Sequence, residues 1–265
     1  MNYVINLHIL EGCNFKCKYC FAKFGSRKIL DIDSWKIIID NIVNEVDVKR
    51  FNIAGGEPML YPQLQELIDY IHSKNIDISI ITNGYLLSSN FLEKNKDKIE
   101  TIGISIDSFD EDMLRKLDCT YKGNIFDFDK FKALAIKTKE LGMNLKINTV
   151  VSKYNYDYNL KKYLDEFDVD RWKILKMKVF KDDKFDNSDL DIDENSFNQF
   201  IENNQSDNLI IEYSLKNSYI IIDSNGYLLD NSSENYIKIA NLQNEGFIDA
   251  FKKLDFDLDL YNERY

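Results

Sequence analysis

The sequence has little proline, few cysteines, no excess of positive charge and no long uninterrupted apolar run. Its 265 residues carry a formal net charge of −11, which argues against a nucleic-acid polymer as partner, because that partner needs broad positive surface. No stretch approaches the roughly 20 apolar residues that span a bilayer. The opening MNYVINLHIL also lacks the basic segment and apolar run of a secretory signal. We therefore expect a cytoplasmic protein with no membrane partner.

Internal repeats and low-complexity linkers are also absent, and a hydrophobic content of 44% is sufficient for a full core, so we expect one soluble domain. Short apolar runs alternate with helix-like segments. The predicted strands are Val4–Leu7, Phe51–Ala54, Ile76–Ile81, Ile102–Ile106, Leu145–Val151 and Trp172–Val179. This alternation predicts parallel strands with right-handed crossovers, and so an α/β fold with a partial (β/α)6 TIM-like barrel.

Helix signals lie between these strands. Apolar residues at positions 64, 67, 68 and 71 share one helical face. Asp33 and Ser34 offer an N-cap before Trp35–Val46. A further helix is predicted over Phe128–Leu141, closed by Gly142.

The last third of the chain has a different character, acidic and rich in asparagine. We predict a barrel core over 1–181 and a C-terminal extension over 182–265 that caps the barrel. The extension offers two strand-like runs, LIIEY and SYIIID, a turn at Asn225-Gly226 and a last helix over Phe247–Leu254. Its opening stretch, DDKFDNSDLDID, is predicted to be a solvated loop.

Cysteine is scarce but unevenly placed, since three of the four lie between positions 13 and 20. In a reducing compartment such cysteines are more often metal ligands or catalytic groups than disulfides. The motif C-x3-C-x2-C, formed by Cys13, Cys17 and Cys20 with Tyr19 before the last, resembles the cluster motif of radical S-adenosylmethionine enzymes. The resemblance implies three thiolates on a [4Fe-4S] cluster whose fourth iron is open to S-adenosylmethionine.

Both prolines, Pro58 and Pro62, lie in one loop after the second predicted strand. In a barrel, functional groups collect at the carboxyl ends of the strands. Gly55-Gly56-Glu57-Pro58 matches the GGEP motif of the same superfamily; its glycines allow close backbone approach, and Glu57 offers an acceptor for the cofactor's ammonium group. The resemblance implies a cofactor site formed by Tyr19, Gly55, Gly56, Glu57, Asn83 and Ser105.

Several longer segments resemble viperin and its microbial relatives, and the more specific of them are LKINTVVSKYN and DRWK. This resemblance implies a lyase, antiviral in its best-known relatives, that converts a ribonucleoside triphosphate to its 3′-deoxy-3′,4′-didehydro form. A 5′-deoxyadenosyl radical would take the C4′ hydrogen, and an external donor such as a flavodoxin or ferredoxin would supply electrons. CTP is the default substrate, with UTP and GTP as alternatives.

Cations near the strand ends fit such a substrate. Residues two apart on a strand share a face, as Lys146 and Asn148 do, and as Arg171 and Lys173 do. We therefore predict a nucleotide site, converging on the barrel mouth, that consists of Arg50, Asn52, Lys146, Asn148, Arg171 and Lys173. The alternative interpretation is a set of solvated charges that form surface salt bridges.

One family feature is missing. Where relatives have Ile-Gly-Arg-Gly, with an arginine for the cofactor carboxylate, this chain has Leu117-Asp118-Cys119-Thr120, and only Arg115 or Lys122 could substitute. Two other functions stay open: a radical enzyme of another branch acting on a peptide or a deazapurine precursor, and a non-catalytic zinc module with His8 or Cys119 as fourth ligand. The motifs identify no separate catalytic acid, base or hydrogen donor.

Overall fold

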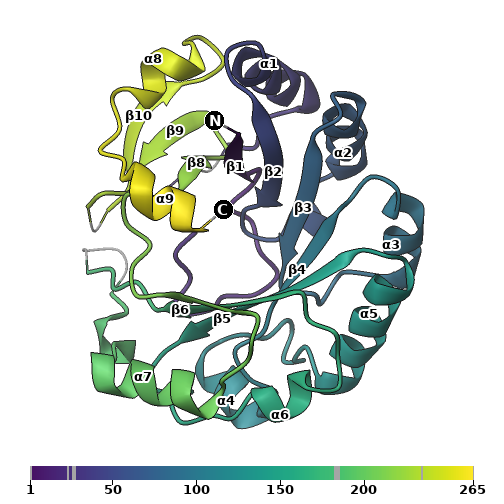
Figure 1. Ribbon diagram of the computed structural model, residues 1–265, viewed down its shortest axis with the longest axis vertical. Helices are drawn as coiled ribbons and strands as arrows, with labels where there is room; N and C mark the ends of the chain where they lie inside the picture. Colours follow the sequence, from purple (N-terminus) through teal and green to yellow (C-terminus); the bar gives the residue numbers. More distant parts are fainter. Residues whose placement is uncertain (1, 23, 26–27, 182–185, 234, 265) are drawn as a thin grey trace.

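A single curled sheet organises the protein (Figure 1), as seen in a computed structural model that describes residues 2–264 except 23, 26, 27, 182–185 and 234. Its strand order is β10-β9-β8-β1-β2-β3-β4-β5-β6-β7, and every pairing from β8 to β7 is parallel. The strands are β1 (Tyr3–His8), β2 (Val48–Ala54), β3 (Asp77–Thr82), β4 (Thr101–Ser105), β5 (Asn144–Val151), β6 (Arg171–Lys176), β7 (Leu209–Glu212), β8 (Ile220–Ile222), β9 (Tyr227–Asp230) and β10 (Ile237–Asn241).

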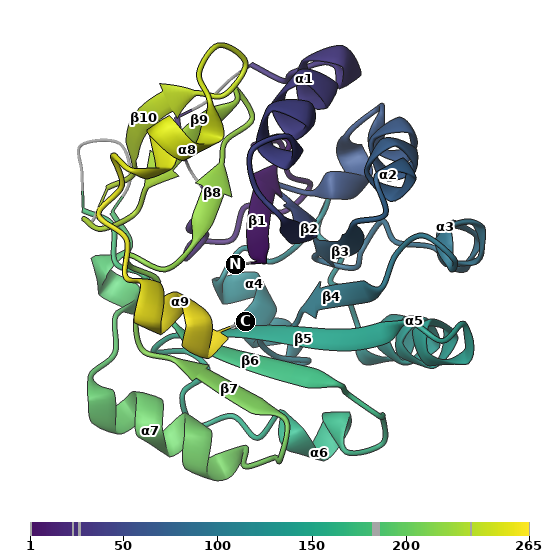
Figure 2. The same cartoon turned by 45° about the horizontal axis from the view of Figure 1, so that its top comes forward.

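Helices cover the outer side of the curled sheet, as both views show (Figures 1 and 2). The helices are α1 (Ile32–Val43), α2 (Leu64–Ser73), α3 (Ser89–Asn95), α4 (Glu111–Lys116), α5 (Phe128–Glu140), α6 (Lys161–Leu164), α7 (Glu194–Asn203), α8 (Phe247–Phe251) and α9 (Leu258–Arg264), with 3-10 turns η1 (Pro58–Leu60) and η2 (Ser188–Leu190). Among the described residues, even the longest helix, α5, is too short to cross a bilayer.

The predicted partial barrel is confirmed, since β1 to β6 overlap the six predicted strands. The predicted start of the first helix is wrong: α1 begins at Ile32 and its N-cap is Asp31, not Asp33 or Ser34. Asp31 has an extended backbone, so its carboxylate reaches forward to accept a hydrogen bond from Ser34 N at 2.9 Å. The predicted helix after Asp127 ends at Glu140, with Gly142 just beyond it.

The C-terminal extension contributes to both ends of the sheet. β7 pairs with β6, whereas β8 pairs with β1 and continues into the antiparallel strands β9 and β10. The boundary at 181/182 stays a prediction, and residues 182–185 lie outside the described part of the chain. The rest of that predicted loop is not wholly solvated, because Asn187 and Leu190 are buried.

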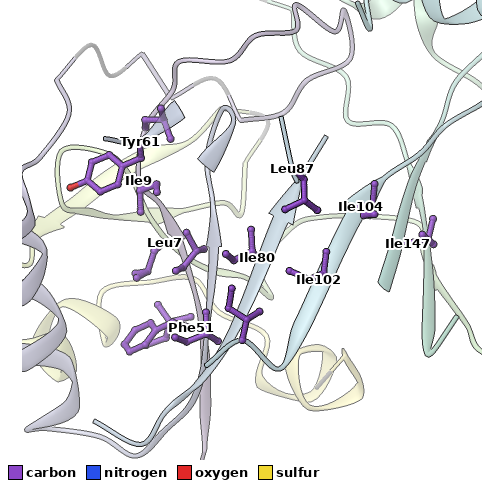
Figure 3. Packing of buried hydrophobic residues seen from close by; sticks show 14 of the residues in the cluster. Leu7, Ile9, Phe51, Tyr61, Ile80, Leu87, Ile102, Ile104 and Ile147 are labelled. Carbon is purple, nitrogen blue, oxygen red and sulfur yellow. The ribbon is translucent and has the colours of Figure 1, made fainter. Parts of the chain in front are cut away.

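Side-chain alternation along the strands separates an apolar outer layer from a polar interior. In β5, Leu145, Ile147, Thr149 and Val151 are buried against the helices, and the residues between them face inward. Figure 3 shows Phe51, Ile80 and Ile102 from neighbouring strands side by side in the buried layer. Burial of each such side chain stabilises the fold by about 1.5–3 kcal/mol. Trp172 belongs to this layer, as predicted.

Helix α9 lies in the opening between the two ends of the curled sheet (Figures 1 and 2). Tyr261 Oη accepts a hydrogen bond from Val4 N of β1 at 2.5 Å. Arg264 Nη2 donates to the Ser214 carbonyl at 2.6 Å. The end of the described chain therefore contacts the interior of the barrel near β6 and β7.

Candidate active site

One cavity inside the curled sheet gathers most of the predicted site residues. It is lined by inward-facing residues of β1 to β6, by the loop after β1, and by residues near β8 and β10. Predicted residues on its wall are Cys13, Cys17, Tyr19, Cys20, Asn52, Gly55, Gly56, Asn83, Ser105, Lys146, Asn148 and Lys173. Glu57, Arg50 and Arg171 lie outside this lining.

The three cysteines belong to the loop between β1 and α1, and a second segment fixes that loop in place. Backbone amides of Lys16 and Lys18 donate to the carbonyls of Asp118 and Leu117, at 3.2 and 3.0 Å. Lys18 Nζ also donates to the Lys116 carbonyl at 2.7 Å. The segment after α4, which lacks the family arginine, therefore supports the cysteine loop through its backbone.

The surroundings of Cys13 and Cys17 favour the neutral form of their thiols. Burial raises the pKa of Cys13 to about 12, and the nearby Cys17 and Cys20 add to that effect. A hydrogen bond with Cys119 and burial raise the pKa of Cys17 well above its ordinary value. Because metals bind thiolates, cluster binding at this loop would release protons.

The donor set fits an iron–sulfur cluster better than a single metal ion. All three thiols face one cavity and influence one another's charge, so each could ligate a different iron. Within the described residues, no three His, Cys, Asp or Glu side chains are arranged around one point that could hold a metal ion. The zinc alternative therefore gains no support from the geometry.

The two glycines of the GGEP motif pack directly against the cysteine loop. A Cβ atom on Gly55 would lie 2.4 Å from the Leu10 carbonyl oxygen, and its φ of 143° is unfavourable for other residues. A Cβ atom on Gly56 would lie 2.1 Å from the Gly12 oxygen. These positions require glycine because two backbones meet there, beside the thiols.

Glu57 lies beneath the cavity wall and is fully buried. Its carboxylate accepts hydrogen bonds from Thr82 Oγ1 at 2.7 Å, Asn83 N at 2.9 Å and Met59 N at 3.1 Å. Burial raises the pKa of Glu57, and these three donors act against that rise. The side chain therefore joins the GGEP loop to the end of β3 and positions Asn83 on the wall.

Tyr19, a residue of the cysteine loop, contacts the segment that follows β4. Its hydroxyl donates to Asp107 Oδ2 and is 3.1 Å from Cys119 Sγ. Burial raises the pKa of Asp107 to about 7. Cys119, distant in sequence, thus lies beside the cysteine loop. Arg115, considered above as a substitute for the missing family arginine, forms an ion pair with Glu111 on α4.

The predicted nucleotide-binding residues were expected to converge on the barrel mouth. The structure places them deeper inside the barrel. Lys146 and Lys173 are each the third residue of their strands, and Lys146 is paired in register with Arg171. Burial lowers the pKa of Lys146 well below its ordinary value, and the charges of Lys173, Arg171 and Arg50 lower it further. The four predicted cations are therefore close enough to repel one another.

Contacts differ among the remaining predicted residues. Arg50 forms an ion pair with Glu100 at 2.5 Å, and Arg171 Nη2 donates to the Arg264 carbonyl at 2.5 Å. Asn52 Nδ2 donates to Asn6 Oδ1 at 3.0 Å. The pairing of Arg50 matches the salt-bridge alternative, whereas Lys146 and Lys173 face the cavity.

Some cavity residues were not among the predicted cofactor and nucleotide residues, although His8 was considered as a zinc ligand. They are Asn6, His8, Asp107, Tyr219 and Tyr236. The first two could have been found, because they are the polar residues at alternate positions of an otherwise apolar strand. Burial lowers the pKa of His8 to about 4, so its imidazole is neutral at pH 7.

Comparison with known proteins relates this site to one superfamily. A family described as the Radical SAM superfamily matches residues 7–167. The chain is 35% identical to an S-adenosylmethionine-dependent nucleotide dehydratase of Selenomonas ruminantium, over 100% of this chain and 99% of that protein. It is 33% identical to a protein of the same name from Fibrobacter sp. (strain UWH6), over 99% and 87% of the two chains.

The fold has relatives among solved structures. The structure described as native anSMEcpe with bound AdoMet and Kp18Cys peptide superimposes with a TM-score of 0.73, covering 98% of this chain and 82% of that one. Its sequence identity of 17% shows a shared fold alone.

Proposed function

Because the chain belongs to the radical S-adenosylmethionine superfamily, and within it to the S-adenosylmethionine-dependent nucleotide dehydratases, we propose that it dehydrates the ribose of a ribonucleoside triphosphate. The cofactors of the superfamily are a [4Fe-4S] cluster and S-adenosylmethionine. When bound, they supply a 5′-deoxyadenosyl radical, the hydrogen-abstracting species of this chemistry. The proposed product is the 3′-deoxy-3′,4′-didehydro nucleotide, formed by loss of the C4′ hydrogen and the 3′ hydroxyl.

One observation carries the proposal: a single cavity is lined both by the three cysteines and by Lys146 and Lys173. In a chain of net charge −11, two inward-facing lysines beside two partly buried arginines are a local excess of positive charge that a triphosphate would neutralise.

Roles follow from position. Cys13, Cys17 and Cys20 would hold the cluster, and the wall formed by Tyr19, Gly55, Gly56, Asn83 and Ser105 would hold the cofactor, with Glu57 beneath it. Asn52, Lys146, Asn148 and Lys173 would bind the nucleotide, with Arg50 and Arg171 adding positive charge. CTP is the proposed substrate, with UTP and GTP as alternative substrates. A flavodoxin or ferredoxin would supply the electrons.

Nucleotide-dependent cleavage of S-adenosylmethionine tests the proposal. The reconstituted, dithionite-reduced protein is incubated with S-adenosylmethionine and each of the four ribonucleoside triphosphates, and 5′-deoxyadenosine is measured by chromatography. We expect one triphosphate to raise its production well above the basal level and to be converted to a dehydrated product. Absence of stimulation by all four would refute a nucleotide substrate.

A matched pair of variants tests the phosphate site. Lys146→Met should raise the KM for the nucleotide roughly tenfold to a hundredfold, because a charge-assisted hydrogen bond contributes about 1.5–3 kcal/mol. Lys137→Met removes a lysine that pairs with Glu93 on the surface and should leave the KM unchanged. Equal KM values in the two variants would show that Lys146 does not contact the substrate.

A further inference from the structure

A buried carboxylate lies among the cations of the cavity. Glu212, the last residue of β7, is 4% exposed, and its Oε1 forms an ion pair with Lys173 Nζ, whose residue is 3% exposed. Tyr219 Oη donates to Glu212 Oε2 and accepts a hydrogen bond from Lys173 Nζ at 2.9 Å. Arg264 Nε lies 3.8 Å from Glu212 Oε1.

This carboxylate does not balance the positive charge around it. The charged groups with the largest effect on Lys146 are the cations Lys173, Arg171 and Arg50 and the carboxylate Glu212, and of these cations Arg50 is paired with Glu100. Arg264 adds another cation on the far side of Glu212, with its guanidinium 4.4 Å from the Tyr219 ring centroid. The cavity thus keeps a positive excess that attracts an anion even while Glu212 holds Lys173.

We propose that Glu212 is an internal counterion of Lys173, that a bound phosphate group competes with it for the Lys173 ammonium, and that Glu212 therefore limits the affinity for phosphate-bearing ligands. The inference rests on the proposed function, because it assigns the cavity to a triphosphate.

The physical reason is competition for one buried ammonium group. Lys173 and Tyr219 both line the cavity, so an incoming phosphate oxygen can reach the same hydrogen-bond donors that Glu212 occupies. The displaced carboxylate has buried surroundings and stays close to the phosphate, where unit charges interact strongly because the medium is less polarisable than water. Glutamine has the same shape without the charge, so Glu212→Gln should remove both the competition and the repulsion.

Binding of inorganic tripolyphosphate and of CTP to the reconstituted full-length protein tests the inference, by anaerobic titration calorimetry without S-adenosylmethionine. We expect Glu212→Gln to lower the Kd for both probes roughly tenfold relative to the unsubstituted chain. A gain in affinity separates this role from a structural one, because a damaged pocket would lose affinity.

Two controls sharpen the result. Glu93→Gln makes the same substitution at a surface ion pair with Lys137 and should leave the Kd unchanged. In a Lys173→Met background, adding Glu212→Gln should change the Kd by much less than it does alone, since the contested ammonium is gone.

The outcomes are distinct. Equal or weaker binding by Glu212→Gln, with measurable binding by the unsubstituted chain, overturns the counterion role and leaves the proposed function standing. If neither chain binds tripolyphosphate or CTP, the phosphate site of the proposed function fails and the counterion inference is refuted with it.

Discussion

Lys173 illustrates how the interior sets the charge of a single residue. Burial lowers its pKa from 10.5 to about 8, Glu212 acts against that change, and the neighbouring Arg171 and Arg264 add to it. Lys146 is shifted in the same direction. A phosphate bound to either ammonium favours the charged form, so binding and protonation are linked.

This linkage predicts a pH dependence of binding. Below pH 8 the Lys173 ammonium is charged before the ligand arrives; as pH rises through about 8 it loses its proton, and binding must recover that proton. We expect the affinity for CTP, whose terminal phosphate titrates below this range, to fall roughly tenfold between pH 7.5 and 9.5, as measured by calorimetry.

Arginine at the same position is the control. Lys173→Arg keeps its charge across this range, so its affinity should fall less steeply with pH. A pH slope in Lys173→Arg equal to that of the unsubstituted chain would assign the dependence to another group.

At the scale of elements, the cysteine loop depends on two neighbours. The turn after β2 supplies Gly55 and Gly56, whose backbones touch the loop, and the segment after α4 supplies carbonyls for its amides. A loop without regular secondary structure is thus held from two sides, which keeps three thiols directed at one cavity.

Gly56→Ala should disrupt this arrangement. The added methyl group would meet the Gly12 carbonyl oxygen at 2.1 Å, and backbone at this position cannot move without moving the loop. We expect a loss of stability of about 1–3 kcal/mol in urea unfolding, together with a clear fall in iron bound per chain.

Gly12→Ala is the matched control in the same loop, because its methyl group would meet only the Leu10 side chain at 3.7 Å. It should retain both stability and iron content. Full iron loading of Gly56→Ala would mean that the loop does not need this contact.

At the scale of the whole molecule, charge is segregated. The chain carries −11 overall, yet the barrel interior concentrates lysine and arginine, and α9 adds Arg264 where the sheet stays open. Burying like charges near one another destabilises the unliganded fold, so a bound polyanion should stabilise it by more than screening alone.

Tripolyphosphate at about a hundred times its Kd should therefore raise the Tm by roughly 5–10 °C, from a stabilisation of about 2.7 kcal/mol. Differential scanning fluorimetry measures the shift, and sodium chloride at equal ionic strength is the reference. Lys146→Met should show a smaller shift. An equal rise of the Tm in sodium chloride would show that the stabilisation comes from ionic screening alone.

Much of the architecture could be predicted from local sequence. Apolar runs such as Leu145–Val151 and the helical face of Leu64, Leu67, Ile68 and Ile71 were sufficient to predict the strands and helices, because burial periodicity is a local property. The error at the start of α1 came from two acidic residues, Asp31 and Asp33, that are equally good caps in composition.

Only part of the site could be predicted from local sequence. The cysteine spacing and GGEP are contiguous, so they predicted a cofactor region, and the strand alternation predicted that Lys146 and Lys173 share one interior, as they do in the cavity. Tyr219, Asp107 and Cys119 come from distant segments with no motif of their own, and only folding brings them beside the cavity.

By itself the sequence determined which functional groups accompany each strand: thiols follow β1, glycines follow β2, and cations lie on β5 and β6. Tertiary structure alone decided which charges face one another, because Glu212 lies 39 positions from Lys173 in the sequence, yet both are buried in one ion pair. The strength of an electrostatic interaction depends on distance and burial, and neither is written in a linear spacing.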